Sequence, residues 1–339
     1  MTSQSRSPSG GGSSSSFKSA VPAFSGLLAG CTSTFLLYPL ELIKVRLQVN
    51  ESYKGGGVGS KQFRTELRTI MNLSGGRGFM KLRGLYNGLG PSLVGNGVSW
   101  GGYFYVYENV KSRMAVDKEL SSVDYIGAAA VSGATMVMLT NPIWLIKTRI
   151  QLQLPTAGEA NYTGVFDAAT RIVKDEGFFA LYKGVVPALM LVSHGMVQFG
   201  VYENLKKAFP SYAALKKSTD KQVSVVERLV DSSGYLAFGA LSKMIASTVT
   251  YPVQVVKSRL QQRQDAAFEI VKDAGGEAGG EIKRVRRNYT TVLGTVTRIM
   301  RKEGVAGFFK GSLANAARVA PNAAIVFVVY ESCMDLGVR

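Results

Sequence analysis

Apolar residues gather in six long stretches that carry almost no charge and are separated by polar segments. Each stretch is roughly 20 residues long, the length that an α-helix needs to cross the hydrocarbon core of a bilayer. The fifth stretch contains Lys243 and the sixth contains Arg318. The six stretches are residues 19–40, 84–107, 126–146, 184–202, 232–256 and 311–330. Uncharged stretches of this length are uncommon in soluble chains, so we predict six membrane-spanning helices rather than buried helices of a soluble protein.

The polar segments between these stretches complete a regular plan. Long basic segments follow the first, third and fifth stretches, and shorter segments follow the second and fourth. Six spans put both ends of the chain on one side of the membrane and the three basic segments on the other. Within the basic segments we predict short amphipathic helices that lie on the membrane surface. They are expected at residues 61–73, 165–174 and 291–302.

Two segments fall outside this plan. Residues 1–19 are rich in Ser and Gly and are predicted to be disordered, and they carry no secretory or transit signal. The third basic segment contains an insertion, about residues 264–287, which is rich in Gly and charge and is expected to be mobile. Its basic run from Lys283 to Arg287 favours an anionic lipid surface over nucleic acid, because no nucleic-acid-binding motif accompanies it.

Three copies of one helix–loop–helix unit account for most of the chain. Each odd stretch ends with Pro, a variable residue two positions later, then Lys, Arg and Gln at alternate positions from the fifth onward. Each even stretch begins with an aromatic-x-Gly turn and ends with Tyr-Glu. The three prolines are Pro39, Pro142 and Pro252. The predicted repeats are residues 20–115, 120–208 and 222–336.

The proline phrase predicts a gate at one end of the bundle, called here the proline end. Proline kinks a helix, so three kinked helices around an axis can converge there. Residues after the kinks could then pair between repeats. At most one full charge pair is available, for example Glu41 with Lys147, because Trp144 and Gln254 stand where the other copies would have the acid. The gate residues are expected to be Glu41, Lys44, Lys147 and Lys257, braced by hydrogen bonds from Gln48, Gln151 and Gln261.

A second gate is predicted where the even stretches end in Tyr-Glu. Glu108 could pair with Lys206, and Glu331 with Lys111, across repeats. The alternative is an ordinary pair three residues apart on the surface of one helix. The expected gate residues are Glu108, Lys111, Glu203, Lys206 and Glu331. Two gates on either side of a site near mid-membrane provide alternating access.

The amino-acid composition excludes several kinds of functional site. The chain has one histidine, two cysteines and a formal net charge of +17. These numbers argue against a disulfide scaffold, a zinc site and a nucleophile–histidine catalyst, so we expect no enzyme, no metal and no prosthetic group. Charges inside spans are costly and are functional candidates by default. Lys243 and Arg318 are both positive, which predicts an anionic ligand, and His194 is a further candidate.

The repeated phrases resemble the signature of the mitochondrial carrier family. That signature is Pro-x-[Asp/Glu]-x-x-[Lys/Arg]-x-[Lys/Arg], followed by [Asp/Glu]-Gly-x-x-x-x-aromatic-[Lys/Arg]-Gly. Copies two and three retain Glu176-Gly177 and Glu303-Gly304, whereas the first has Met80-Lys81. The resemblance implies an all-α membrane protein with six helices and pseudo-threefold symmetry. It also implies a monomer in the mitochondrial inner membrane, with the proline end on the matrix side and the second gate on the cytoplasmic side. A peroxisomal or plastid membrane is the alternative location.

Shorter phrases resemble the branch of the family that carries nucleotide-type cofactors. Asn141 to Trp144 is similar to that branch, and Gln254 is similar to FAD and folate members rather than to NAD or pyrimidine nucleotide members. Ser193-His194 and Ser242-Lys243 are similar to the same phrases. The resemblance implies transport of FAD, with folate as the first alternative and NAD or a pyrimidine nucleotide as the next. A non-transporting membrane scaffold on the same fold is the alternative of another class.

The resemblance also implies substrate contacts on the even helices, at fixed spacing from the aromatic-x-Gly turns. In this sequence the spacing gives Gly95-Asn96, Leu191-Val192 and Arg318, with Trp100 as a surface on which a ring could stack. The expected substrate residues are Gly95, Asn96, Trp100, Leu191, Val192, His194, Lys243 and Arg318. The aromatic-x-Gly turns resemble the family's cardiolipin sites, where helix N-termini favour phosphate.

Overall fold

The structure is a computed structural model, and it describes most of the chain. The described residues are 12–51, 60–73, 84–115, 121–153, 161–208, 233–262, 267–271, 281–285, 289 and 291–338. All structural statements below concern these residues.

Every apolar stretch of the sequence forms helix in its described part. The long helices are α1 (Gly12–Val49), α4 (Leu89–Met114), α5 (Ser122–Leu152), α8 (Ser193–Ala208), α11 (Ser233–Val249) and α14 (Ser312–Val338). Two shorter helices extend the fourth and fifth stretches, α7 (Val185–Met190) and α12 (Tyr251–Gln261). A capping box at Ser121 and Asp124 fixes the start of α5, because each side chain bonds the backbone of the other residue.

Four helical segments of the described chain are long and apolar enough to cross a membrane. They are Ser25–Val49, Val123–Leu152, Phe178–Ala208 and Val305–Met334. Ala237–Val249 is a shorter apolar helix in the fifth stretch. α4 has 26 residues, but Gly, Ser and Asn are mixed into it, which lowers its hydropathy.

The three predicted surface helices are confirmed. They are α2 (Ser60–Leu73), α6 (Val165–Glu176) and α13 (Val292–Glu303). Each packs one apolar face against the helix that precedes it, and the three repeats thereby form three equivalent hydrophobic clusters. Ile70, Ile172 and Ile299 are the buried residues at the centres of these faces. They pack with Leu42 of α1, Leu145 of α5 and Val255 of α12, respectively.

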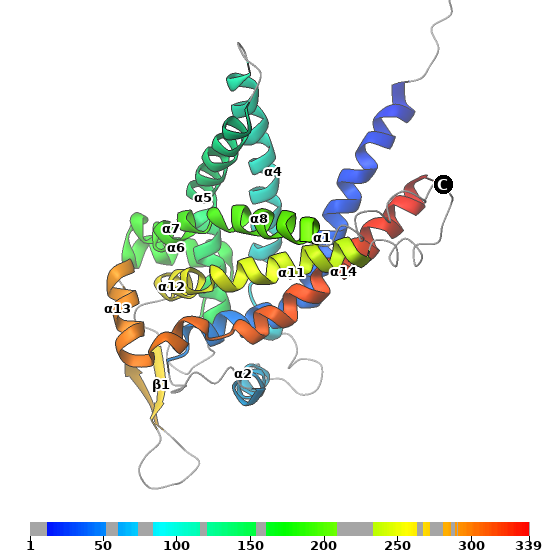
Figure 1. The fold of residues 1–339 in the computed structure, drawn as a ribbon. Helices are drawn as coiled ribbons and strands as arrows, with labels where there is room; N and C mark the ends of the chain where they lie inside the picture. The colour runs from blue at the N-terminus through cyan, green and yellow to red at the C-terminus, as the bar shows by residue number, and fades with distance from the viewer. Residues whose placement is uncertain are drawn as a thin grey trace, which may run out of the picture.

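The long helices lie side by side as three pairs, each formed by two neighbouring repeats. Figure 1 shows α4 beside α5, α8 beside α11, and α14 beside α1, which are also the helix pairs with the most extensive contact. The three pairs run outward in different directions from the region of α12, α6 and α13. The first and last helices of the chain therefore close the ring, as the predicted pseudo-threefold arrangement requires.

The structure differs from the sequence expectations in the leader and in the insertion. α1 begins at Gly12, inside the Ser/Gly-rich leader that was expected to be disordered, and residues 1–11 lie outside the described residues. In the insertion, β1 (Ala267–Val271) and β2 (Glu281–Val285) form an antiparallel hairpin in which Ile270 is opposite Ile282. This hairpin is a local addition to an otherwise helical fold.

The aromatic-x-Gly turns require glycine for a geometric reason. Gly88, Gly184 and Gly311 all have φ between 81° and 85°, in the left-handed region that glycine adopts without steric cost. A Cβ at Gly311 would lie 3.0 Å from both the Lys44 carbonyl and the Tyr251 hydroxyl. The turn therefore brings the start of each even helix directly against an odd helix.

Gly311→Ala is expected to lower the melting temperature of the detergent-purified protein. The strained backbone alone costs about 1–2 kcal/mol, before the contact with Lys44 is counted. Gly90→Ala is the matched control, because Gly90 is helical and nothing lies within 4 Å of its Cβ position. The melting temperatures are measured by following fluorescence during heating, without a thiol-reactive dye. Equal values for the two variants would contradict this account of the turn.

Candidate functional site

The residues that follow the three prolines meet at the proline end. Glu41 of α1 forms an ion pair with Lys147 of α5, which is the pair that the sequence suggested. Lys44 Nζ donates a hydrogen bond of 3.0 Å to Gln254 Oε1 of α12. The first repeat is thus joined to both of the others. Arg318 of α14 extends this cluster, with its guanidinium 3.7 Å from the Glu41 carboxylate.

The three predicted glutamines each make a hydrogen bond to a different repeat. Gln48 and Gln261 accept from hydroxyl groups, and Gln151 donates to one. The contacts are Gln48 with Ser258 at 2.8 Å, Gln151 with Tyr38 at 2.9 Å and Gln261 with Thr148 at 3.1 Å. They form a cycle around the axis, so the glutamines fasten the three odd helices to one another.

A ring of buried arginines lies directly beside the glutamines. Each arginine Nε donates to the main-chain carbonyl of a glutamine in the next repeat. The bonds are Arg46 to Gln151 at 3.2 Å, Arg149 to Gln261 at 3.3 Å and Arg259 to Gln48 at 2.9 Å. These arginines were not among the predicted gate residues. The signal was present, because Arg recurs at the same place in all three copies of the phrase.

Two of the arginines also bind the carboxylates of the acid-Gly pairs. Arg149 binds Glu176, and Arg259 binds Glu303 through both of its terminal nitrogens. Burial alone would raise the pKa of Glu176, but hydrogen bonds from Arg149 and Lys183 lower it to about 2. In the first repeat the corresponding position is Met80, outside the described residues, and Arg46 instead donates to the Gln153 carbonyl at 3.1 Å.

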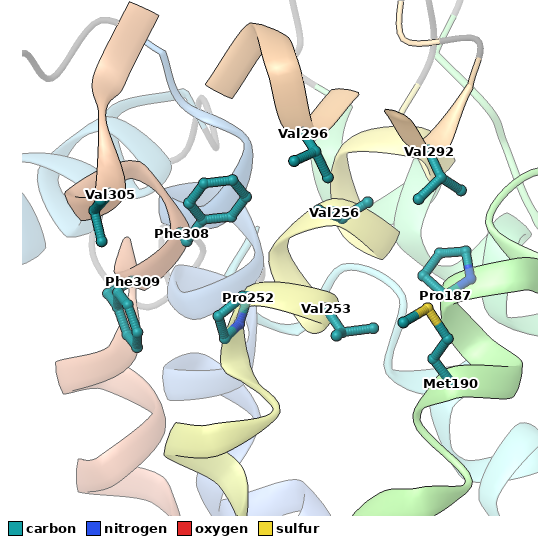
Figure 2. Close-up of a pocket in the computed structure, with 10 residues that line it drawn as sticks. All are labelled: Pro187, Met190, Pro252, Val253, Val256, Val292, Val296, Val305, Phe308 and Phe309. Atoms are coloured by element: carbon teal, nitrogen blue, oxygen red, sulfur yellow. The ribbon is translucent and has the colours of Figure 1, made fainter. Parts of the chain in front are cut away.

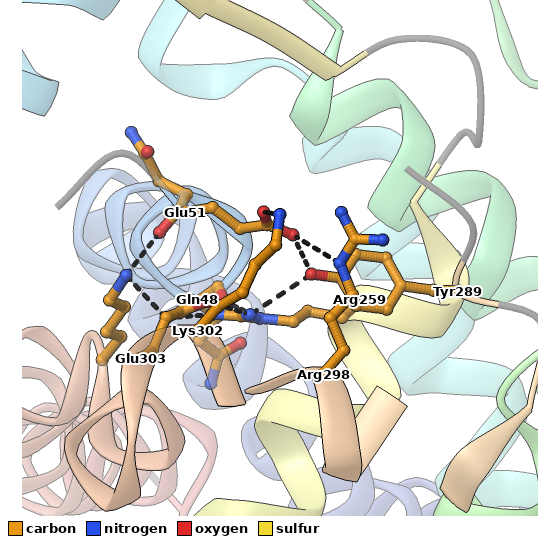
Figure 3. Close-up of polar contacts among 9 residues, drawn as sticks. Gln48, Glu51, Arg259, Tyr289, Arg298, Lys302 and Glu303 are labelled. Atoms are coloured by element: carbon orange, nitrogen blue, oxygen red, sulfur yellow. Dashed lines mark hydrogen bonds and ion pairs between the residues drawn. The ribbon is translucent and has the colours of Figure 1, made fainter. Parts of the chain in front are cut away.

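The contact between the third and first repeats contains additional charged groups (Figure 3). The Tyr289 hydroxyl donates to Glu51, and Arg298 and Lys302 of α13 each lie 3.5 Å from the same carboxylate. Burial, together with Glu51, raises the pKa of Tyr289 to about 12. Lys310 further donates to the Asn50 carbonyl at 2.9 Å. We call this group the Glu51 cluster.

Three predicted substrate residues, Gly95, His194 and Arg318, lie close to the variable residue of the next repeat's proline phrase. A Cβ at Gly95 would lie 3.5 Å from the Trp144 indole. Arg318 lies against Glu41, as described. His194 reaches Gln254 through Thr250, whose hydroxyl lies 2.9 Å from His194 Nδ1 and 3.4 Å from Gln254 Nε2. These three residues therefore lie next to the predicted gate.

Thr250 connects His194 to the helix before it. The Thr250 hydroxyl donates to the Ala246 carbonyl at 2.8 Å and lies 2.9 Å from His194 Nδ1. Thr250 also separates α11 from α12, and His194 is the second residue of α8, next to the break from α7. The bond thus joins the interruptions of two neighbouring helices.

Other predicted substrate residues are placed differently. Leu191 and Val192 form the break between α7 and α8, and a Cβ at Gly133 of α5 would lie 2.8 Å from Val192 Cγ1. Val192 therefore packs between helices. Trp100 is 63% exposed, one turn beyond Asn96, and its ring packs on Phe104 with centroids 6.1 Å apart. Lys243 of α11 interacts electrostatically with Arg318.

One residue of the second predicted gate forms a contact within its own helix. Lys111 pairs with Glu108 of α4, at 2.8 Å. Glu203 and Lys206 lie on α8 and Glu331 lies on α14. The three helix pairs diverge away from the proline end (Figure 1). The alternative of an i,i+3 surface pair therefore describes the contact that is present.

An apolar pocket of about 330 Å³ lies outside this cluster (Figure 2). It is formed by α7, α12, α13 and the segment that leads to α14. Its walls include Pro187, Met190, Val256 and Phe308, and every side chain that lines it is apolar. Such a pocket offers no polar partner to an anion.

Three helix pairs around a buried basic cluster define a polytopic membrane protein built from three repeats. The family described as mitochondrial carrier protein matches this chain three times, over residues 15–118, 118–213 and 230–339. The chain therefore belongs to the mitochondrial carrier family, whose members are transporters.

Several relatives cover nearly the whole chain. The chloroplastic folate transporter 1 of Arabidopsis thaliana is 38% identical, over 93% of this chain and 94% of the relative. The mitochondrial nicotinamide adenine dinucleotide transporter 2 of the same plant is 33% identical, over 92% and 78%. The mitochondrial FAD carrier protein FLX1 of Saccharomyces cerevisiae is 30% identical, over 91% and 94%.

Thr250→Val is expected to lower the melting temperature, because it removes a buried hydroxyl that serves Ala246, His194 and Gln254. A lost hydrogen bond that leaves a buried partner unpaired costs about 1–3 kcal/mol. Thr248→Val is the matched control, since Thr248 is exposed and bonds only back to the Met244 carbonyl of its own helix. A melting temperature for Thr250→Val equal to that of the control would refute the proposed link.

Glu176→Gln should be more damaging than Asp167→Asn, which removes a partly exposed pair with Arg171. Breaking a buried pair costs about 3–5 kcal/mol, because the remaining charge, here Arg149, is left uncompensated. Since folding lowers the pKa of Glu176 to about 2 from 4.5, its contribution is complete above the higher value. The contribution is lost as pH falls towards 2. Melting temperatures of both variants between pH 7 and pH 3 test this, and a pH slope unchanged in Glu176→Gln would contradict it.

Proposed function

We propose that this protein transports an anionic, ring-containing cofactor across an organelle membrane by alternating access. FAD is the first candidate and folate the second. The observation that carries the proposal is the charge of the cluster at the proline end. Its mutually interacting basic side chains are Lys44, Lys147, Lys243, Lys257 and Arg318. Among the described residues that interact with them, Glu41 is the one carboxylate.

This charge imbalance supports an anion as the transported species. Basic groups held together away from water are costly unless an opposite charge compensates them. A phosphate or carboxylate on the substrate would supply it, and Arg318 can bind either in a bidentate manner. The His194 ring adds a hydrogen-bonding group beside the cluster, which suits the polar edge of a heterocycle.

Folate is a candidate because this chain is similar in sequence to a named folate transporter. The relative that is 38% identical is named a folate transporter, and the one that is 30% identical is named an FAD carrier. Both substrates combine an anionic part with a fused ring, so the cluster is compatible with either. One of these relatives is named chloroplastic and the other mitochondrial. We therefore propose the mitochondrial inner membrane as the location and a plastid membrane as the alternative. Within this proposal the proline end faces the matrix, the aromatic-x-Gly turns bind cardiolipin, and the carrier acts as a monomer.

The decisive experiment is uptake by proteoliposomes that contain the purified protein, with FAD, folate, NAD and UTP compared. Arg318→Ala is expected to reduce uptake of the true substrate by about tenfold or more, since a charge-assisted hydrogen bond contributes about 1.5–3 kcal/mol. Arg301→Ala, an exposed change on α13, is the control and should transport normally.

The outcomes separate the candidates. FAD uptake that depends on Arg318 supports the first proposal, and folate uptake with the same dependence supports the second. Equal uptake of NAD or UTP would contradict the assignment to the FAD and folate branch. Folded protein that transports none of the four would favour a non-transporting scaffold on the carrier fold.

A further inference from the structure

The lysines of the three proline phrases outnumber the acids available to them. Lys44, Lys147 and Lys257 occur at equivalent positions, but the residues three positions before them are Glu41, Trp144 and Gln254. One acid therefore serves three lysines. The structure shows which basic side chains contact the Glu41 carboxylate.

Lys147 forms the ion pair with Glu41, and Arg318 lies 3.7 Å from the same carboxylate, whereas Lys44 interacts with Glu41 electrostatically without a direct ion pair. Lys44 donates to the neutral amide oxygen of Gln254 at 3.0 Å. Lys257 interacts electrostatically with Lys147, and it has no carboxylate partner within the part of the chain that the structure describes. An amide compensates an ammonium group much less well than a carboxylate does. Two positive charges at the proline end thus remain without a full counter-charge.

These two lysines border the predicted substrate positions. Lys44 interacts electrostatically with Arg318 and with Lys257. Its hydrogen-bond partner, Gln254, is linked through Thr250 to His194. An anion held by Arg318 would consequently lie next to the lysines of the proline phrases.

We propose that the anionic end of the substrate completes this set of charges by binding Lys44 and Lys257 together with Arg318. The substrate class is then a ligand that carries at least two negative charges close together, such as a pyrophosphate or a pair of carboxylates. This inference rests on the proposed function and specifies where the anion binds.

Gln254 becomes the specificity-determining residue in this arrangement. A carboxylate at this position would pair with Lys44, as Glu41 pairs with Lys147, and would remove the need for an external anion. The neutral amide holds Lys44 in place without neutralising it. The absence of an acid at position 254 therefore favours binding of a multiply charged ligand.

The test is Gln254→Glu, which changes one amide to a carboxylate of nearly the same shape. Inorganic pyrophosphate and orthophosphate are used as probes of binding, and FAD, folate and riboflavin as probes of transport. Gln62→Glu on α2 is the matched control, since it adds the same charge away from the cluster. Lys257→Gln is a second variant, which removes a cation without breaking an ion pair.

In the wild-type protein, pyrophosphate is expected to raise the melting temperature more than orthophosphate does. Gln254→Glu should raise the melting temperature of the ligand-free protein and should abolish the shift caused by pyrophosphate. Its KM for the transported cofactor should increase about tenfold or more. Lys257→Gln should also reduce the pyrophosphate shift, and Gln62→Glu should behave as wild type.

The results distinguish this inference from the proposed function. Uptake of FAD or folate that is unaffected by Gln254→Glu would overturn the inference and leave the proposed function standing. A wild-type protein that pyrophosphate does not stabilise would also overturn it. Stabilisation by pyrophosphate that is lost in Gln254→Glu, without uptake of either cofactor, would support the anion site and reject FAD and folate as cargo. Riboflavin transported as well as FAD would overturn the requirement for charge.

Discussion

The structure depends on three buried arginines that bind the main chain of the next repeat. Arg46, Arg149 and Arg259 each donate to a glutamine carbonyl, so the bonds run in one direction around the bundle axis. Because a guanidinium donates in several directions at once, it can hold a neighbouring repeat and a carboxylate of its own repeat simultaneously. The position of the proline-end cluster follows from this ring, since the glutamines that it holds and the lysines one turn earlier belong to the same helical segments.

The chemistry of the site follows from an imperfect repetition. A perfectly repeated phrase would offer one acid to each of the three lysines. In this chain Trp144 and Gln254 interrupt this matching, while the arginine ring and the glutamines keep all three helices in place. The residues that position the three helices are therefore different from the residues that set the net charge of the site. The fold supplies a symmetric frame, and two substituted positions give it a local excess of positive charge.

The sequence predicted the elements well because their signals are local and occur three times. The surface helices at 61–73, 165–174 and 291–302 agree closely with α2, α6 and α13. A pair between Glu41 and a lysine of another repeat was also inferable, since Glu41 is the one acid of the three phrases, and Lys147 was an expected partner. The bond from His194 to Thr250 was not, because two residues of different helices meet only once the helix breaks are known. The contact of Val192 with Gly133 was not inferable for the same reason, because it depends on the break between α7 and α8. The ion-pair partners of the residues at the Tyr-Glu end depend on how far the helix pairs diverge. No local sequence pattern predicts that divergence.

The Glu51 cluster has a consequence for how the ring of repeats is held together. The polypeptide itself connects the first repeat to the second and the second to the third. No peptide bond connects the third repeat back to the first, and this is the junction where Tyr289, Arg298 and Lys302 gather around Glu51. One of the three junctions is therefore closed by non-covalent contacts alone, which are the packing of α14 on α1 and, at the proline end, the polar bonds of the Glu51 cluster. Salt and acid weaken the polar part of this junction, so its closure depends on solution conditions in a way that a peptide bond does not.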